Sequence, residues 1–450
     1  MQLMKEVEDE VTQVLTELIR INTTNPPGNE TAAAKYLSEH LRREGFTCEL
    51  YESAPERGSV ITRMKGTGEK PSLLLLSHLD VVAADPKEWS VDPFAGVVKD
   101  GFVWGRGALD MKGMTAIEMM VLKLLKRNHI KLKGDVIFAA TADEEQGGLS
   151  GADYLLRRYP NKIFAPYVLN EGGGLAISTR NGNVFTVQTA EKGILWFKVK
   201  AKGTPGHGSM PNVADNAIMR MNKVVSKLGN YRSKVLLVPT VKRFLEEIAR
   251  EDATMQEPFR RLLANPELGD VILDELAKTS PQLAEEIRPR LRMTLTPTII
   301  HGGVKENVIP SECETVFDCR ILPGQESAQA IGLINRLLAE VDPEKLLFES
   351  MQVQEPSEST AETPLYDAIS EVLRELEPNS GVTPTLTTGG TDSRFFRRKG
   401  SVCYGFQPMH PEEASGAVVK REHGIDERIS IENLVFGTSV LYETVKRFMT

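Results

Sequence analysis

Short apolar runs alternate with helical patterns in the first 170 residues, and this alternation constrains the fold more than any other feature of the chain. The runs cover residues 72–78, 136–141 and 167–169, and helical patterns at about 111–127 and 149–158 separate them. Strands that alternate with helices at this spacing form a mostly parallel sheet with helices on both faces. We therefore expect an α/β domain built around such a sheet.

A second unit interrupts this domain. The pattern changes near residue 191, and the segment that follows predicts an α+β unit, with strands near 195–200, 293–300, 313–321 and 346–351 and helices at 213–228 and 327–339. The chain of 450 residues also exceeds the usual size of a single core. We predict one domain formed by 1–190 and 353–450, and a second domain inserted at 191–352 with a charged helical insertion at about 241–290.

Composition excludes several classes of partner. A formal net charge of -8 argues against binding to nucleic acid or to anionic membranes. Residues 1–20 have the pattern of an acidic amphipathic helix rather than of a secretory signal, and no apolar run is long enough for a transmembrane helix. The four cysteines show no CxxC spacing, so neither a thiolate zinc site nor a disulfide framework is indicated. We expect a cytoplasmic protein that acts on small molecules.

Polar residues follow each of the three apolar runs. His78 and Asp80 close the first run, Glu144 and Glu145 follow the second, and Glu171 follows the third. Ligands of parallel sheets bind beyond the carboxyl ends of the strands, which is where these side chains are expected to lie. Taken singly, each has a simpler interpretation, such as a polar turn after a buried strand.

Two further residues extend the series. Asp110 stands directly before a predicted helix, where an N-cap alone would explain it, and His423 stands in a polar loop far downstream. A carboxylate such as Asp110 can also bridge two cations. Neighbours on an extended segment point in opposite directions, so Glu144 and Glu145 are expected to do different work. With His78 and Glu171, this set of imidazoles and carboxylates suits two divalent ions, most simply Zn²⁺, with Co²⁺ or Mn²⁺ also acceptable.

The motifs together resemble those of the M20 family of metallopeptidases. The runs are SHLDVV (77–82), VWGRGALDMKG (103–113), ADEEQGG (142–148), NEGGG (170–174), GTPGHGSMP (203–211) and EHGIDERI (422–429), and they span nearly the whole chain. The resemblance implies a catalytic domain with two zinc ions and an inserted lid domain that often forms a homodimer.

The resemblance also implies roles for individual residues. Asp110 would bridge the metals, His78 and Glu171 would complete one site, and Glu145 and His423 the other. Glu144 matches the general acid/base, Asp80 the residue that orients His78, and His207 a lid histidine that reaches the partner's site and stabilises the oxyanion.

The substrate class follows from a second loop and from the lid. Arg394, in GGTDSRF (389–395), is suited to a bidentate grip on a free carboxylate, and we favour this role over a surface salt bridge. Asn307 resembles a substrate-contacting lid asparagine. We expect hydrolysis of an amide or peptide bond in an N-acyl amino acid or a dipeptide. A synthase that runs this chemistry in reverse, a deacylase of a biosynthetic intermediate and a non-catalytic binding protein remain as alternatives.

Overall fold

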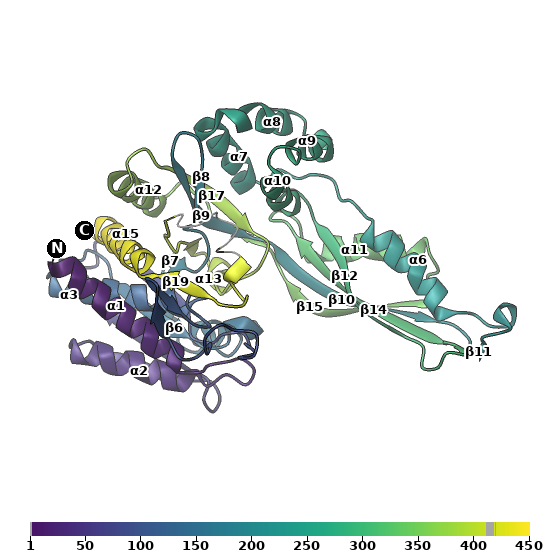
Figure 1. The fold of residues 1–450 in the computed structure, drawn as a ribbon, viewed down its shortest axis with the longest axis horizontal. Coiled ribbons are helices and arrows are strands. Elements are labelled where there is room, and N and C mark those ends of the chain that lie inside the picture. Colours follow the sequence, from purple (N-terminus) through teal and green to yellow (C-terminus); the bar gives the residue numbers. More distant parts are fainter. Residues whose placement is uncertain (1, 411–417, 419) are drawn as a thin grey trace.

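The computed structural model describes residues 2–410, 418 and 420–450. Figure 1 shows two regions: an α/β region that contains both ends of the chain, and an elongated region that extends away from it. A group of helices from the middle of the chain lies over the side of the α/β region that faces the elongated one.

A ten-stranded sheet forms the centre of the α/β region, in the order β1-β2-β6-β3-β7-β18-β9-β16, with β8 and β17 also paired to β9. Its strands are β1 (Cys48–Glu52), β2 (Gly58–Met64), β3 (Leu73–His78), β6 (Val136–Thr141), β7 (Tyr167–Asn170), β8 (Ala176–Ser178), β9 (Asn183–Glu191), β16 (Ser357–Glu358), β17 (Gly381–Thr387) and β18 (Val402–Gly405). The neighbours β6, β3, β7 and β18 pair in parallel, whereas β1, β2, β8 and β16 pair antiparallel. The expected parallel sheet is thus confirmed at its centre, and antiparallel strands extend it on both sides.

Helices cover both faces of this sheet, as the continuous apolar runs require. In β3, Leu73 and Leu75 pack into one core and Leu74 and Leu76 into another. The first core is completed by α1 (Gln2–Arg20), α2 (Glu30–Arg43), α3 (Lys112–Arg127), α12 (Pro364–Leu376) and α15 (Ile431–Met449), and the second by α4 (Ala152–Arg158), α5 (Pro160–Ile163) and α13 (Ser393–Arg397). Each fully buried leucine stabilises the fold by about 1.5–3 kcal/mol.

The elongated region is built on an antiparallel sheet in the order β12-β14-β10-β15. Its elements are β10 (Gly193–Lys202), α6 (Ala217–Gly229), β12 (Thr294–Gly302), β14 (Glu312–Ile321), α11 (Ser327–Ala339) and β15 (Leu346–Gln354), and both helices share one apolar core with the sheet. A two-stranded ribbon of β11 (Gly206–His207) and β13 (Val308–Ile309) lies at the end farthest from the α/β region (Figure 1).

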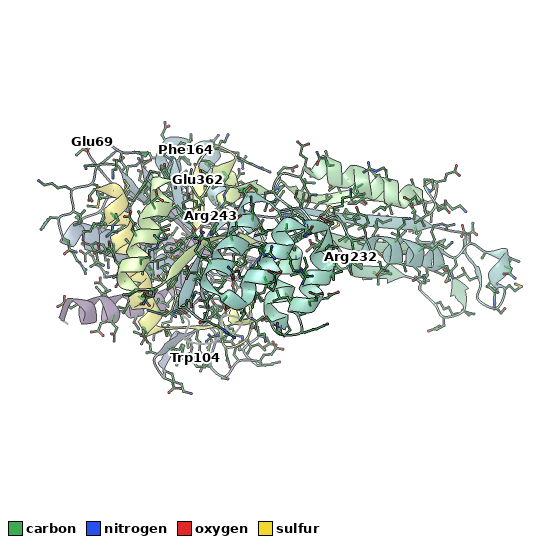
Figure 2. All side chains as sticks on the ribbon, turned by 90° about the horizontal axis from the view of Figure 1, so that it is seen from above. Glu69, Trp104, Phe164, Arg232, Arg243 and Glu362 are labelled. Carbon is green, nitrogen blue, oxygen red and sulfur yellow. The ribbon has the colours of Figure 1, made fainter. Side chains whose placement is uncertain are left out.

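The helical insertion packs mainly on the α/β region, and Leu322, which follows β14 of the elongated region, also joins its core. Its helices are α7 (Pro239–Glu251), α8 (Ala253–Ala264), α9 (Gly269–Leu276) and α10 (Pro281–Ile287), and their apolar side chains share a core with Val184, Ala190 and Leu386 of β9 and β17. In Figure 2, Arg243 of α7 lies over the α/β region, where its guanidinium stands 5.0 Å from the ring centre of Tyr366. Within the described residues, no helix combines the length and apolarity needed to cross a membrane.

Candidate metal centre

Three neighbouring strands end at the same edge of the central sheet, and the expected site residues follow them there. His78 is the last residue of β3 and pairs in register with Thr141 at the end of β6. Glu144 and Glu145 follow β6 in a short 3-10 helix (Glu144–Gln146), and Glu171 follows β7. The carboxyl ends of parallel strands therefore bring one imidazole and three carboxylates together.

Asp110 joins two clusters of side chains through its two carboxylate oxygens. Its Oδ1 lies 2.9 Å from His78 Nε2, and its Oδ2 lies 2.7 Å from His423 Nε2. Glu171 Oε2 stands 3.5 Å from His78 Nε2, and Glu145 Oε2 stands 3.4 Å from His423 Nε2. The five side chains form two triads that share Asp110, and the ligand atoms of each triad lie within 4.8 Å of one another.

This donor set fits a pair of divalent cations. Imidazole nitrogens and carboxylate oxygens suit zinc, cobalt or manganese, and one carboxylate with two oxygens can bind two ions about 3.5–4 Å apart. Glu145 Oε1 is buried and has no hydrogen-bond partner among the described residues. Burial raises the pKa of Glu171 to about 8, even though His78 acts against this shift. Bound cations would hold such crowded carboxylates in their ionised form.

The adjacent glutamates differ in their surroundings. Glu145 belongs to the triad with Asp110 and His423, whereas Glu144 belongs to neither triad. Burial raises the pKa of Glu144 well above its usual range, and the charge of Glu171 adds to the shift. A carboxyl group with a raised pKa, next to the candidate ligands but outside both sets, has the properties of a general acid/base.

Asp80 acts mainly on the loop that carries the two glutamates. Its carboxylate accepts the backbone N–H of Glu144 and that of Glu145, each at 3.0 Å, and the side-chain amide of Asn25 at 2.8 Å. His78 Nδ1 lies 2.9 Å from the backbone oxygen of Asp80 and 3.4 Å from its carboxylate. Asp80 thus orients His78 mostly through its main chain, and it fixes Glu144 and Glu145 through its side chain.

Two residues that the sequence did not single out connect Asp110 to His423. The fully buried Glu427 accepts the backbone N–H groups of Gly107, Leu109 and Asp110 at 2.7–3.1 Å, and it pairs with Arg106 at 2.7 Å. Arg106 also donates to the backbone oxygen of His423 at 3.3 Å. Arg106 and Glu427 stand inside the two motifs that carry Asp110 and His423, and this position in the sequence could have identified them as candidates.

The loops that bear these residues are further tied by a small sheet. It pairs β19 (Arg428–Ser430) with β5 (Phe102–Trp104), and β5 with β4 (Val97–Lys99). Thus β5 precedes Asp110 by a few residues, and β19 closely follows His423. Segments more than 300 residues apart in the sequence therefore meet at the triad of Asp110, Glu145 and His423.

Arg394 lies beside the site, but its donors are engaged by the protein. It donates to the backbone oxygen of Thr391 at 2.6 Å and to that of Gly147 at 2.9 Å, and its guanidinium stands 4.5 Å from the ring centre of Phe395. Because Gly147 ends the turn that starts at Glu144, these contacts position the loop of the two glutamates.

His207 and Asn307 lie far from the metal centre of the same chain. His207 is in β11, at the distal end of the lid (Figure 1), and its Nδ1 is 2.8 Å from the hydroxyl of Ser209. The backbone N–H of Gly208 donates to the backbone oxygen of Asn307, so the two residues belong to one tip. Within one subunit, neither side chain reaches the triads.

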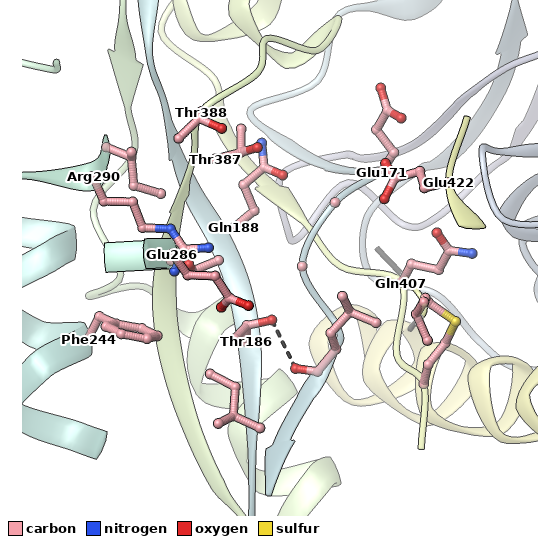
Figure 3. A pocket seen from close by; sticks show the side chains of 18 of the residues that line it. Glu171, Thr186, Gln188, Phe244, Glu286, Arg290, Thr387, Thr388, Gln407 and Glu422 are labelled. Carbon is pink, nitrogen blue, oxygen red and sulfur yellow. Dashed lines mark hydrogen bonds between the residues drawn. The ribbon is translucent and has the colours of Figure 1, made fainter. Parts of the chain in front are cut away.

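A cavity of about 370 Å³ opens beside the triad of His78, Asp110 and Glu171. Asp110 and Glu171 are among its lining residues, and so are Phe244, Glu286 and Arg290 of the helical insertion. Figure 3 shows Glu171 on one side of the cavity and these three side chains of the insertion on the other. Thr186 and Gln188 of β9 lie between the two sides in this view. The cavity has the size of a small-molecule site and adjoins the residues that would do the chemistry.

An α/β sheet that gathers two triads around a shared aspartate, with an acid beside them, defines the class of two-metal hydrolases. Residues 74–447 match Peptidase family M20/M25/M40, so the chain belongs to this family. It is a hydrolytic enzyme of that family, and the resemblance read from the motifs is confirmed.

Curated relatives are similar over most of the chain. Probable carboxypeptidase S-like 2 of Dictyostelium discoideum is 28% identical, over 86% of this chain and 74% of that protein. N-fatty-acyl-amino acid synthase/hydrolase PM20D1 of Homo sapiens is 26% identical, over 99% of this chain and 89% of that protein. Aminoacylase-1 of Sus scrofa is 27% identical, over 90% of this chain and 88% of that protein.

Solved structures show the same fold. The M20 family metallo-carboxypeptidase Sso-CP2 from Sulfolobus solfataricus aligns with a TM-score of 0.73 at 20% identity, over 98% of this chain and 99% of that one. The YXEP protein of Bacillus subtilis, described as a dinuclear metal binding peptidase, aligns with a TM-score of 0.63 at 16% identity, over 98% of both chains.

Proposed function

We propose that this enzyme is a di-zinc hydrolase of an amide or peptide bond in a small substrate with a free carboxylate. The single observation that carries the proposal is the position of Asp110, whose two oxygens each contact the histidine of a different triad. A carboxylate that binds a single metal ion does not require its two oxygens to lie beside two different histidines. Two divalent ions, when bound, lower the pKa of water and polarise the carbonyl of the scissile bond.

The site residues bind the metals or act as the acid/base. His78, Asp110 and Glu171 form one ligand set, and Asp110, Glu145 and His423 form the other. Glu144 takes a proton from the attacking water and returns it to the departing amine, because its carboxyl group is free of both ligand sets.

The substrate is an N-acyl amino acid or a dipeptide. This choice is supported by the relatives, which include aminoacylases, an N-fatty-acyl-amino acid synthase/hydrolase and a probable carboxypeptidase. The second candidate is the same amide chemistry in the synthetic direction, favoured by the similarity to PM20D1 over 99% of the chain. Incubation with a free amino acid and a fatty acid, followed by mass spectrometry, distinguishes the two directions.

The two adjacent glutamates provide a matched pair of variants for the main test. We expect Glu144→Gln to retain two equivalents of zinc and to lose nearly all turnover of N-acyl amino acids, because only the acid/base is removed. Glu145→Gln is expected to lose one zinc as well. Metal content measured by mass spectrometry after dialysis, beside rates on zinc-loaded protein, tests both. An active Glu144→Gln enzyme would refute the assignment, and a Glu145→Gln protein with two zinc ions would show that the roles are exchanged.

A homodimer through the lid is part of this proposal. His207 and Asn307 would serve the metal centre of the partner subunit, as the family resemblance implies. Support comes from large apolar side chains that are exposed around the lid tip, including Met210, Val213 and Val304, of which Val304 is 97% exposed. A cytoplasmic location is kept as a proposal from the sequence.

A further inference from the structure

The helical insertion supplies one wall of the cavity beside the metal centre. Phe244 of α7, Glu286 of α10 and Arg290, which ends a 3-10 helix (Arg288–Arg290), line the same cavity of about 370 Å³ as Asp110 and Glu171. Figure 3 shows their side chains directed from the insertion toward the cavity, opposite Glu171 and Gln407. A substrate held at the metals must therefore meet the insertion.

Arg290 brings to this wall a positive charge that forms no ion pair with a carboxylate of the described residues, and its guanidinium stands 5.7 Å from the ring centre of Phe244. Its Nε is buried and has no hydrogen-bond partner among the described residues. Neighbouring Glu286 forms no ion pair with it within 4.0 Å in this part of the chain, and instead accepts a hydrogen bond from Gln282 at 3.1 Å. Burial lowers the pKa of Arg290, but a guanidinium remains charged at neutral pH. Arg290 as a whole is only partly buried, so its guanidinium can still reach the cavity, and a ligand that pairs with the buried Nε would offset the cost of its desolvation.

Other arginines around the site are already paired. Arg394 donates to two backbone oxygens, and Arg320 of β14 grips Asp318 through two bonds of 2.7 and 3.0 Å. Arg397 forms a buried pair with Glu191 at 2.7 Å. Among the described residues that line the cavity, Arg290 is the cationic side chain.

The segment around Arg290 is fixed to the sheet. The buried Lys192, at the junction of β9 and β10, donates through Nζ to the backbone oxygens of Pro289 and Arg292, both at 2.8 Å. Its backbone N–H donates to Thr387 at the end of β17 at 3.1 Å. Two hydrogen bonds thus hold the segment on either side of Arg290 to Lys192, and the third ties Lys192 to β17, which also lines the cavity. These contacts pre-organise the segment that carries the guanidinium.

We propose that Arg290 binds a carboxylate of the substrate across the cavity from the metals, and that the insertion thereby selects acidic substrates. The planar guanidinium of arginine matches a carboxylate through two parallel hydrogen bonds. The apolar side chains of Phe244, Ile177 and Met409, which also line the cavity, suit the hydrocarbon between that carboxylate and the scissile amide. The proposal deepens the proposed function and rests on it. The carboxylate belongs either to the amino acid or to the acyl group.

Three ligands separate these two sources. N-hexanoyl-leucine carries only the amino-acid carboxylate, N-glutaryl-leucinamide carries only an acyl carboxylate, and N-hexanoyl-leucinamide carries none. Their affinities are measured by calorimetry on zinc-loaded protein with Glu144→Gln, which prevents turnover. Arg290→Met is compared with Arg290→Lys, and with Arg288→Met as the control, because Arg288 belongs to the same short helix but is not among the residues that line this cavity. Methionine retains the apolar stem beside Phe244, and Arg290→Lys retains the charge if the first variant folds poorly.

We expect Arg290→Met to weaken the ligand with the relevant carboxylate by about 10- to 100-fold, as the loss of a charge-assisted hydrogen bond implies. Arg290→Lys should recover part of this affinity, and Arg288→Met should lose none. The neutral ligand should bind all variants equally. Equal weakening of all three ligands, or no weakening of either acid, would overturn the role of Arg290 alone. A wild-type protein that neither binds nor hydrolyses any of them would overturn the proposed function as well.

Discussion

Replacement of Asp80 by asparagine tests whether the loop of the two glutamates depends on one buried carboxylate. Asp80 is fully buried and receives three N–H donors at 2.8–3.0 Å, from Asn25 and from the backbone of Glu144 and Glu145. Burial acts to raise the pKa of Asp80, but His78 and these donors hold it below its usual range, so the group is ionised. An asparagine has the same shape, with one acceptor oxygen and no charge.

The cost follows from these contacts. In its best orientation, the amide oxygen of Asp80→Asn keeps the donors Asn25 and Glu145, and its NH₂ group faces the N–H of Glu144. The lost charge-assisted bond contributes about 1.5–3 kcal/mol, and each retained bond weakens by about 1 kcal/mol when the acceptor loses its charge. We therefore expect the free energy of unfolding to fall by about 4 kcal/mol, a large part of the roughly 5–15 kcal/mol typical of a folded protein.

Urea unfolding of the metal-free protein at pH 7 measures this cost, because chelation removes any contribution from lost zinc. Asn25→Ala, which removes one donor and leaves the carboxylate, is the control and should cost about 1–3 kcal/mol. After zinc is added back, Asp80→Asn should also bind less metal, since Glu145 is a candidate ligand whose backbone N–H has lost its charged acceptor. A metal-free Asp80→Asn protein within 1 kcal/mol of the wild type would refute the account of the loop.

Two further predictions concern the lid and its junction. If His207 serves the partner's site, co-expression of His207→Ala with Glu144→Gln should restore about a quarter of wild-type activity from two inactive parents. The reason is that half of the dimers would combine the two variants, and each such dimer would carry one intact site. Activity no greater than that of the parents would contradict a role of His207 in the partner's site. Burial lowers the pKa of Lys192 from 10.5 to about 7, so between these values the unfolded chain binds more protons and stability should rise with pH. Urea unfolding from pH 7.5 to 9.5 should show this rise for the wild type and a smaller one for Lys192→Met, and equal slopes would contradict it.

The centre of the fold was predictable because its signals are local. Leu73 to Leu76 form a continuous apolar run, and such a run must be buried on both faces. Polar residues at the ends of these runs then fall at one edge of the sheet. The strands β9 and β17 were harder to recognise, since β17 contains Pro384 and several threonines. Pro384 is tolerated because β17 pairs only with β9 among the described strands and so lies at an edge.

Other parts of the site depend on contacts that no local pattern encodes. Glu427 and Arg106 are 321 residues apart in sequence, and only the folded chain shows that they connect the loops of Asp110 and His423. Likewise, the amphipathic pattern of α7 identifies its apolar side but not the surface that this side covers. The sequence therefore predicted a helical insertion without predicting that Arg290 would face the metal centre.

The place of β18 in the sheet has a consequence for how this chain is made. β18 (Val402–Gly405) lies between β7 and β9, so two strands that are complete by residue 191 are joined by one that leaves the ribosome only after residue 400. Until residue 405 has emerged, β7 presents an unpaired edge, and such edges promote aggregation. His423 emerges later still. The nascent protein is thus expected to need protection by chaperones during synthesis, and its second set of candidate metal ligands is complete only after residue 423 has emerged.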